Sequence, residues 1–524
     1  MSLFDSLIEK RIGFVYSEEG IYEPHMISFT VEAGERVEIG DIVCIKHPSK
    51  DVPVFYQVTE VPMRRKAGDY EEDLIRRGQP LRDDTRNYPR AVAKQIGYVD
   101  DISKLRTGGV ETDELMMLIE HVTPLSGVYV PRSDLIEALL TPQHLGLEIG
   151  EIYPNWKHVL KLDLQKLLRQ GVLVVGGVGT GKTTTMLSIV LRLVKMVRRE
   201  GGKPHILIID KDGEYYVEEL INSVGKDEYV EVDVERIYVR VFHDKEDYIN
   251  RLLDEINLAD KRKKPSKEFY EALRKMDLGE ELVLDPRHAE ELLYRAYQSR
   301  LIEVNSFQEI KKAIKDWEDR LRRSVSGIDI EEVIKLLKTK EVIHVNFSKA
   351  KDFNKVYRNL ANLLFRIYDE ALRDVTFGCV VVIDEVHLFA PEKGGIALAS
   401  DDEVVGSLRD ALHLLATTGA RNGITLFVAT QRPSLLSKTV STQMGQNIIA
   451  HRVEDVDLQR LEEIMGGIAS RVRVLPRGWA IVKALASRIK EPLIVRVRPE
   501  AFPKSIGNTA YDRFLKSRLP SSIA

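Results

Sequence analysis

The chain has 524 residues, more than a single hydrophobic core usually serves, so we expect two or three domains. Hydrophobic residues make up 44% and charged residues 30%, and no stretch approaches the roughly 18–20 uninterrupted apolar residues of a membrane span. The formal net charge of -4 argues against a protein that coats nucleic acid through bulk charge, but it is compatible with a localised basic channel.

Two cysteines occur, Cys44 and Cys379, each within an apolar run. They are typical of small core residues in a reducing compartment, and not of a disulfide or a metal site. The N-terminus, Met1 to Asp5, lacks the basic and then apolar pattern of a secretory signal. We therefore expect a cytoplasmic protein without membrane insertion.

Short β-type runs, punctuated by Gly, Pro and Asp, fill the first 150 residues. The runs that we expect to form strands are 11–15, 36–38, 41–45, 54–61, 91–99 and 116–122. Such a series predicts a small β-barrel or sandwich as an N-terminal domain, residues 1–150. A charged stretch, 64–90, is typical of a solvated excursion, with a phosphate contact by its Arg64-Arg65-Lys66 cluster as the alternative.

From Leu164 onward, strands alternate with helices, which is the mark of a parallel α/β sheet. Near-continuous apolar runs are typical of strands that are buried on both faces. The runs that we assign to this sheet are 172–175, 205–210, 342–347, 379–384, 424–430 and 447–453. They predict an α/β core over residues 151–243 and 341–500.

Residues 176–183 read Gly-Gly-Val-Gly-Thr-Gly-Lys-Thr and match the phosphate-binding P-loop, G-x-x-x-x-G-K-[ST]. The apolar run before the loop predicts a strand, and apolar residues at helical spacing after it predict a helix over 183–197. The glycines let successive N–H groups face one anion, while the helix N-terminus and Lys182 add positive charge. This context disfavours the alternative, a chance match in a glycine-rich turn.

We therefore expect a RecA-like P-loop NTPase core that binds ATP. The residues that we place in the nucleotide site are Gly176, Gly177, Val178, Gly179, Thr180, Gly181, Lys182, Thr183 and Thr184. Lys182 is also a catalytic candidate, because its charge lies against the phosphates.

A long charged segment, 244–340, separates the second and third expected strands of the core. Apolar residues recur at helical spacing within it, which predicts a helical subdomain inserted into the core. They are Ile249, Leu252, Leu253 and Ile256; Ile310, Ile314, Trp317 and Leu321; and Ile330, Val333, Ile334 and Leu337. The basic run Lys261 to Lys264 before Pro265 indicates a solvated turn, with a nucleic-acid contact as the alternative.

Hydrolysis also needs a metal ligand and a group that positions water. The apolar strand that starts at Cys379 ends in Asp384-Glu385, which supplies a candidate for each. We expect Asp384 to hold Mg²⁺ through its water shell, alongside the Thr183 hydroxyl, and Glu385 to polarise the attacking water. The alternative is an ordinary strand end in carboxylates, which the P-loop upstream disfavours.

Gln431 directly follows the apolar strand 424–430. A polar side chain at the end of the strand beside the Asp384-Glu385 strand is placed to reach the γ-phosphate and to report its loss. We therefore assign Gln431 as this sensor, with an ordinary strand-end cap as the alternative.

Four motifs, in this order, resemble the HerA branch of the HerA–FtsK superfamily of ring-shaped DNA translocases. They are the P-loop, Asp210-Lys-Asp-Gly-Glu-Tyr215, Asp384-Glu385-Val-His387 and Thr430-Gln-Arg-Pro433. The second is similar to the family's D-x-H-G-E-Y, with Asp212 in place of the histidine, and the fourth to its S-Q-R-P. A small N-terminal barrel of the HAS-barrel type and a helical insertion are also features of the HerA fold.

The resemblance implies an arginine finger that completes the ATP site of a neighbouring subunit. The family commonly has an Arg-Lys pair before the Gln-Arg-Pro strand, and the matching stretch here, 419–423, keeps only Arg421. Arg421 is our candidate for the finger, while Arg432, Arg409 and a plain surface salt bridge remain alternatives. A finger that acts in trans implies a ring.

The resemblance further implies a homohexamer that threads duplex DNA, holds it independently of sequence, and uses ATP and Mg²⁺. By the same analogy, a NurA-type nuclease is the partner in resection and repair of DNA ends, and the C-terminal tail, 501–524, braces a neighbouring subunit. The loop at Lys393-Gly394-Gly395 and the basic residues of the insertion are candidates for DNA contacts. The roles of Asp210, Asp212 and Glu214 stay open.

Two other classes of function are compatible with these motifs. A conjugation or secretion motor would push protein or relaxase-bound DNA at a membrane, which the expected lack of an anchor disfavours. A non-motor clamp would bind ATP without turnover, which Glu385 disfavours because a clamp has no need of a base.

Overall fold

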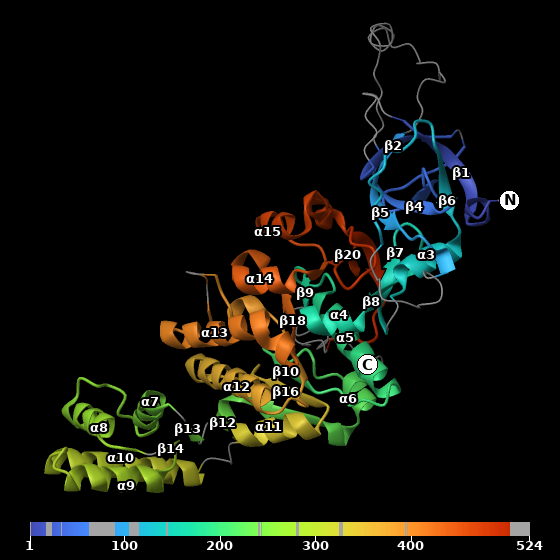
Figure 1. Ribbon diagram of the computed structural model, residues 1–524. Helices are drawn as coiled ribbons and strands as arrows, with labels where there is room; N and C mark the ends of the chain where they lie inside the picture. Colours follow the sequence, from blue (N-terminus) through green and yellow to red (C-terminus); the bar gives the residue numbers. More distant parts are fainter. Residues whose placement is uncertain are drawn as a thin grey trace, which may run out of the picture.

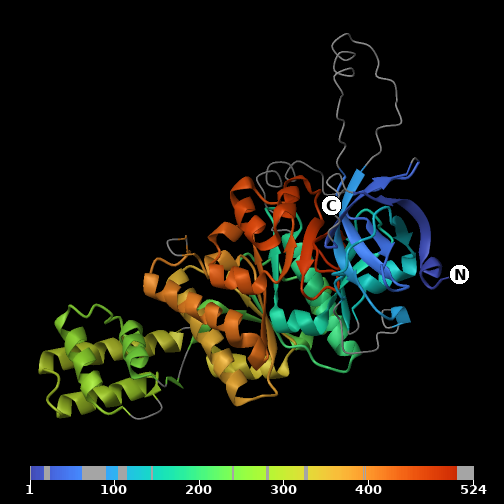
Figure 2. The same ribbon diagram turned by 45° about the horizontal axis from the view of Figure 1, so that its top comes forward.

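The computed structural model describes residues 2–16, 24–32, 34–61, 90–103, 115–142, 145–238, 241–242, 244–278, 282–323, 328–392, 395 and 397–503. These residues form a closed barrel, a long sheet covered by helices on both faces, and a helical bundle (Figures 1 and 2). The predicted fold class, an α/β P-loop core with an N-terminal barrel and a helical insertion, is confirmed. Most of the charged stretch 64–90, Lys393-Gly394 and the tail from residue 504 lie outside the described residues.

The N-terminal barrel, blue in Figure 1, closes six strands in the order β1-β2-β5-β4-β3-β6. Their bounds are β1 Ile8–Val15, β2 Met26–Val31, β3 Ile42–Lys46, β4 Pro53–Glu60, β5 Arg90–Tyr98 and β6 Gly127–Pro131. A 3₁₀ turn, η1 (Phe4–Ser6), precedes the barrel, and helix α3 (Ser133–Leu140) follows it. Closure pairs both edge strands of the sheet, β1 with β6, and so leaves no open edge.

Two of the predicted N-terminal strands are wrong. Residues 36–38 form no strand, and of 116–122 only Met116 makes an isolated bridge, to Tyr98. The barrel instead uses β2 and β6, which were not predicted. In β2 the buried and exposed residues alternate, and the outward ones include both Met26 and Ser28, so the strand shows no clear apolar run. The strand β6 begins with Gly127 and ends with Pro131, which leaves only a short apolar run between them.

The long sheet has the strand order β11-β16-β10-β17-β18-β9-β19-β20-β21-β7-β8. The first seven strands are parallel, and from β19 onward neighbours are antiparallel. Their bounds are β7 Gly146–Ile152, β8 Val159–Asp163, β9 Val172–Val175, β10 Ile206–Asp210, β11 Tyr229–Asp233, β16 Val342–Asn346, β17 Cys379–Ile383, β18 Ile424–Thr430, β19 Asn447–Ala450, β20 Trp479–Ala484 and β21 Leu493–Val497. All six predicted core strands are present, with ends that differ by at most three residues.

Helices cover both faces of this sheet because successive strand residues point to opposite sides. In β9, Val172 and Val174 pack in one core, and Leu173 and Val175 pack in the other. The first core contains α4 (Leu164–Gln170), α5 (Lys182–Arg199) and α6 (Glu218–Val224). The second contains α11 (Ile330–Thr339), α12 (Phe353–Arg373), α13 (Asp402–Thr418), α14 (Lys438–Met444) and α15 (Asp455–Met465). The described 3₁₀ turns between core elements are η2 (Lys226–Glu228), η3 (Val234–Arg236), η4 (Val386–Leu388), η5 (Gly419–Asn422), η6 (Pro433–Leu435) and η7 (Gly467–Val474).

The inserted bundle, green in both views, has a hydrophobic core of its own (Figures 1 and 2). Its helices are α7 (Lys245–Glu255), α8 (Lys264–Lys275), α9 (Pro286–Gln298) and α10 (Val304–Arg323). The strand pairs β12 (Ile237–Tyr238) with β15 (Ile328–Asp329), and β13 (Val241–Phe242) with β14 (Leu282–Val283), form its neck. The basic run Lys261 to Lys264 is exposed at the start of α8.

The structure differs from the predicted insertion, 244–340, at its C-terminal end. The apolar face of α11, which includes Val333 and Leu337, packs in the core of the long sheet and not in the bundle. A local helical period cannot distinguish these two destinations, because both bury one apolar stripe. The predicted barrel boundary at residue 150 likewise falls inside β7, a strand of the long sheet.

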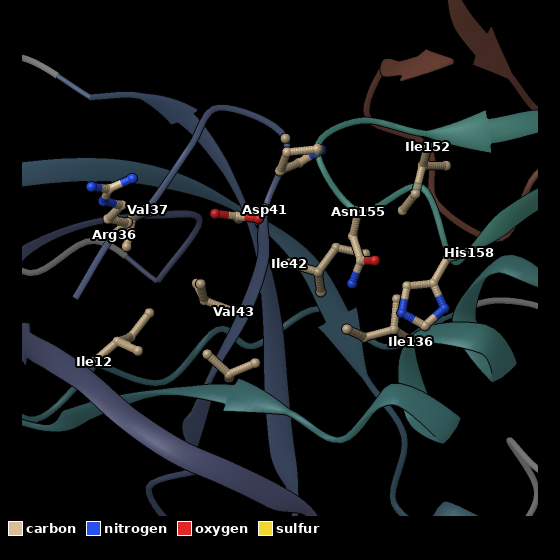
Figure 3. A pocket seen from close by; sticks show the side chains of 13 residues that line it. Ile12, Arg36, Val37, Asp41, Ile42, Val43, Ile136, Ile152, Asn155 and His158 are labelled. Carbon is tan, nitrogen blue, oxygen red and sulfur yellow. The ribbon is translucent and has the colours of Figure 1, made fainter. Parts of the chain in front are cut away.

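The barrel docks on the antiparallel end of the long sheet. Gln57 donates a hydrogen bond from Nε2 to the Pro492 carbonyl (3.0 Å), and the Tyr153 hydroxyl donates to Glu38 (2.5 Å). A cavity of about 150 Å³ lies at this junction, with Asp41 and Val43 on the barrel side, and with Asn155 and His158 opposite (Figure 3). Burial raises the pKa of Asp41, whose carboxylate accepts a hydrogen bond from the Glu38 N–H.

Candidate nucleotide site

With the exception of Arg421, the predicted site residues meet at the carboxyl edge of the long sheet, where ligands of parallel α/β folds bind. The strands β10, β17, β18, β9 and β19 are neighbours and run in the same direction. At this edge, each of the five strands ends in, or is directly followed by, a polar residue or a residue of a predicted motif. These are Asp210 for β10, Asp384 for β17, Gln431 for β18, Gly176 for β9 and His451 for β19.

The P-loop connects β9 to α5, as predicted from its strand–loop–helix context. Gly179 and Gly181 have φ angles of 72° and 120°, which side chains with a Cβ rarely adopt. Val178 is 85% exposed at the tip of the loop, while Lys182, Thr183 and Thr184 form the first turn of α5. The loop therefore presents its backbone and the N-terminus of an 18-residue helix to solvent, which is the arrangement that binds phosphate.

Lys182 is buried between the two carboxylates that follow β17. Its Nζ forms an ion pair with Asp384 and lies 2.9 Å from Oε1 of Glu385. Burial lowers the pKa of Lys182, but the two carboxylates outweigh this effect and hold the pKa above its ordinary value. Burial raises the pKa of Asp384, and the charge of Lys182 only partly offsets it. The charge of the P-loop lysine is thus neutralised by the two residues that we expect to hold Mg²⁺ and water.

Glu385 is held in an unusual backbone conformation, with φ of 51° and ψ of 43°. For a residue with a Cβ, this left-handed region costs about 1–2 kcal/mol, and such strain is concentrated at functional sites. Its carboxylate accepts hydrogen bonds from the backbone N–H (3.1 Å) and side-chain Nε2 (2.5 Å) of Gln431. Burial would raise the pKa of Glu385, but His387 and Lys182 outweigh it and lower the pKa to about 2. Glu385 is therefore a fixed, ionised carboxylate.

Gln431 and Thr430, at the end of β18, connect this carboxylate to the neighbouring strand. The Thr430 hydroxyl lies 3.0 Å from Nδ1 of His387, and the same nitrogen lies 3.3 Å from Glu385 Oε2. Thr430 Oγ1 also accepts the Arg432 N–H at 3.0 Å. The predicted Asp384–His387 and Thr430–Pro433 motifs therefore form one hydrogen-bonded unit.

Asp210 organises the loop that follows β10. Its carboxylate accepts N–H groups from the four residues 212–215, at 2.8–3.3 Å, and the Nε2–H of His344 at 2.9 Å. Burial would raise the pKa of Asp210, but His344 and the backbone donors outweigh it and lower the pKa. The fold of this loop places Glu214 beside Thr183, while the Asp212 side chain is 42% exposed. Asp210 thus has a structural role that the sequence left open.

The residues near Thr183 fit a magnesium ion that is bound together with nucleotide. Thr183 contributes a hydroxyl, and Asp384 and Glu214 contribute carboxylates nearby. In the described part of the chain, no group of three or more His, Cys, Asp or Glu residues forms a metal centre by itself. This donor set suits Mg²⁺, which usually takes one or two carboxylates and completes its shell with water and substrate phosphates.

The three arginines considered for the finger lie in different places. Arg421 is exposed in η5, directly before β18, so the seven residues of β18 separate it from the site by roughly 20 Å. Arg432 forms an ion pair with the buried Asp457 (3.2 Å). Arg409 lies half-buried on α13. Within the described residues, neither Arg421 nor Arg409 has a side-chain hydrogen-bond or salt-bridge partner.

His451 was not identified as a site residue from the sequence, although it lies within the predicted strand 447–453 and directly follows the observed end of β19 at Ala450. It is fully buried beneath the P-loop, where Nε2 lies 2.8 Å from the Thr185 hydroxyl and Nδ1 lies 2.8 Å from the Trp479 carbonyl oxygen. A polar residue at the carboxyl end of an apolar strand was the available signal. The same signal singled out Asp384 and Gln431.

The stability of the fold should fall with acid because of His451. Burial lowers the pKa of His451 from an ordinary 6.5 to about 4, with a further contribution from Lys182. The stabilisation by the neutral ring is therefore complete above about pH 6.5 and is lost as the pH falls toward 4. As the pH falls through this window, the free energy of unfolding of the unmodified chain should decrease. Its slope should be about 1.4 kcal/mol per pH unit steeper than that of a His451→Asn variant. Denaturant titrations at several pH values check this slope, and equal slopes would contradict it.

Among the described residues, no helix has the length and apolar character needed to cross a membrane. Residues 147–367 match a family model described as "Helicase HerA, central domain". A probable helicase of Methanocaldococcus jannaschii is 21% identical, over 93% of this chain and 90% of that protein. The DNA double-strand break repair helicase HerA of Pyrococcus furiosus is 22% identical, over 74% and 76%, and that of Sulfolobus acidocaldarius is 24% identical, over 64% and 66%.

Two solved structures resemble the fold only distantly. VirB4 of Thermoanaerobacter pseudethanolicus has 14% identity and a TM-score of 0.41, over 67% of this chain and 96% of that one. The bacterial conjugative coupling protein TrwB has 13% identity and a TM-score of 0.40, over 66% and 88%.

Proposed function

We propose that this chain, which is a HerA-type ATPase, couples ATP hydrolysis to translocation along DNA. The observation that carries the proposal is the buried group of Lys182, Asp384 and Glu385, joined by the half-buried Gln431, at the carboxyl edge of the sheet. It combines a phosphate-binding cation with an ionised, rigidly held carboxylate, which hydrolysis requires and passive binding does not. DNA is the proposed track because two of the similar proteins are DNA repair helicases.

In this proposal, each residue acts where the structure places it. The backbone of residues 176–181 and the first turn of α5 hold the phosphates of ATP, and Lys182 turns from the carboxylates to the phosphates. Once Lys182 has turned away, Asp384 and Thr183 would hold Mg²⁺, which would supply positive charge to the phosphate oxygens. Glu385 accepts the proton of the attacking water, and Gln431, bonded to Glu385, senses the γ-phosphate.

We further propose a homohexameric ring in which Arg421 completes the ATP site of the next subunit. The exposed position of Arg421, away from its own P-loop, supports an action in trans. Duplex DNA in the channel would be held by its backbone, independently of sequence. A NurA-type nuclease partner, a role in DNA-end repair and a cytoplasmic location remain proposals from the resemblance and the composition.

The ATPase rate measured with and without linear duplex DNA tests this proposal. We expect stimulation on the order of tenfold, within the usual range of coupling between two sites, and a complete loss of activity in Lys182→Ala. The stimulation should weaken steeply as salt rises, because contacts to the DNA backbone release counterions.

The same measurement distinguishes the two alternative functions. ATP turnover that no DNA changes would contradict the translocase and favour a motor that acts on protein. ATP binding without turnover would favour a non-motor clamp.

A further inference from the structure

His451 makes hydrogen bonds to three separate elements around the P-loop. Its backbone N–H donates to the Val175 carbonyl (2.8 Å), which extends the pairing of β19 with β9 by one residue. A carbonyl oxygen can only accept, so Nδ1 carries the ring proton and donates it to Trp479 (2.8 Å). Nε2 is then the acceptor for the Thr185 hydroxyl (2.8 Å). The ring therefore joins β20 to the first turns of α5 as one defined neutral tautomer.

The imidazole ring also fills the space directly under the loop. A Cβ at Gly176 would lie 2.8 Å from the His451 Cβ, and a Cβ at Gly181 would lie 3.4 Å from the ring carbon Cε1. Gly181 has a φ of 120°, which residues with a Cβ rarely adopt, and the imidazole ring packs against this glycine. Gly176 thus approaches this side chain more closely than a residue with a Cβ could, and at Gly181 the ring lies at ordinary contact distance.

Backbone hydrogen bonds attach the loop to one chain neighbour of His451 and to one chain neighbour of Trp479. The Gly177 N–H donates to the Arg452 carbonyl (2.8 Å), and the Gly478 N–H donates to the Thr180 carbonyl (3.0 Å). Arg452 follows His451 in the chain, and Gly478 precedes Trp479. The hydrogen bond from His451 to Trp479 therefore closes a ring of contacts around residues 176–181.

We propose that His451 is a positioning residue for nucleotide binding, which fixes the P-loop backbone in its phosphate-binding shape before the nucleotide arrives. The inference deepens the proposed ATPase function and rests on it. A loop that is already ordered avoids the entropy cost of ordering on binding, so its fixation appears as affinity. The ring contacts the loop through Gly181 and Thr185, which is 1% exposed, so the side chain acts through the loop and not on the nucleotide.

The test compares Thr185→Val, His451→Asn and the double variant in titrations with the fluorescent nucleotide mant-ADP and Mg²⁺. Thr185→Val keeps the shape of the side chain and removes the donor to Nε2. In His451→Asn, the amide N–H can still reach Trp479, but no group reaches Thr185. Each single variant should weaken binding by roughly 3- to 10-fold, the usual effect of one hydrogen bond. The double variant should weaken binding no more than either single variant, because both remove the same hydrogen bond.

Asn447, at the opposite end of β19, provides a matched control. It is fully buried and its side chain makes three hydrogen bonds, to Gln170, Gly171 and Ala486, far from the P-loop. Asn447→Ala should lower the melting temperature and leave the affinity for mant-ADP unchanged. Unchanged affinity in Thr185→Val, or a loss no larger than in Asn447→Ala, would overturn the positioning role. An unmodified chain that fails to bind mant-ADP would overturn the proposed ATPase function as well.

Discussion

A Glu385→Gln variant should bind ATP with unchanged affinity and hydrolyse it about 10²- to 10⁴-fold more slowly, the usual contribution of a general base. The amide has nearly the shape of the carboxylate, and its oxygen can still accept the hydrogen bond from Gln431. What the variant loses is the negative charge that takes the proton from water. Steady-state turnover together with retention of labelled ATP on the protein measures both halves of this expectation.

Glu341 offers a control for the loss of a buried carboxylate. It is 5% exposed and pairs with Arg198 (2.6 Å) before the start of β16, at the edge of the sheet opposite the nucleotide site. Glu341→Gln should change stability but not turnover. If Glu385→Gln kept turnover within a few-fold of the unmodified chain, another group would have to be the base.

Mixing two inactive variants should restore ATPase activity if Arg421 acts in trans. Arg421→Ala should lose about 10³-fold or more in turnover, as expected for an arginine finger, while it still binds ATP. Lys182→Ala should be inactive because its own P-loop lacks the cation. In a mixed ring, the intact Arg421 of a Lys182→Ala subunit can face the intact P-loop of an Arg421→Ala subunit. Activity measured across mixing ratios should therefore pass through a maximum.

The same mixing experiment distinguishes the alternative arginines. Arg432 is already paired with Asp457, so Arg432→Ala should affect stability more than turnover and should not complement Lys182→Ala. A half-buried position on α13 makes Arg409 the remaining alternative. Full activity of Arg421→Ala alone, or mixtures that stay inactive at every ratio, would contradict the assignment of Arg421 as the finger.

Local sequence was sufficient for the parallel half of the sheet and most of the site. The runs at 172–175 and 424–430 were predicted with their observed ends, because strands buried on both faces are continuously apolar. Residues that follow parallel strands meet at one edge of the sheet, so the positions of Asp384 and Gln431 after two such strands predict that both lie near the P-loop. The roles assigned to these residues remain predictions that the variants above test.

The antiparallel part of the sheet could not be predicted in the same way. The strands β20 and β21 pair locally, but β21 pairs with β7 through residues that are more than 300 positions apart. Their side chains are interrupted by Gly, Lys and Arg, so no single segment carries a clear signal. The end of the insertion shows the same limit, because α11 has the helical period of its neighbours but packs in a different core.

The sequence by itself determined that the chain has a P-loop and where the carboxylates and the glutamine of its site lie, since these depend on short-range order around each strand. Only the tertiary structure decided what surrounds them. It showed that Lys182 is neutralised by both carboxylates, that Asp210 folds its own loop, and that His451 supports the P-loop from below. The contacts of Lys182 with Asp384, of Asp210 with His344 and of His451 with Thr185 join residues about 130 to 270 positions apart, and a buried polar group finds such a partner only when the sheet assembles.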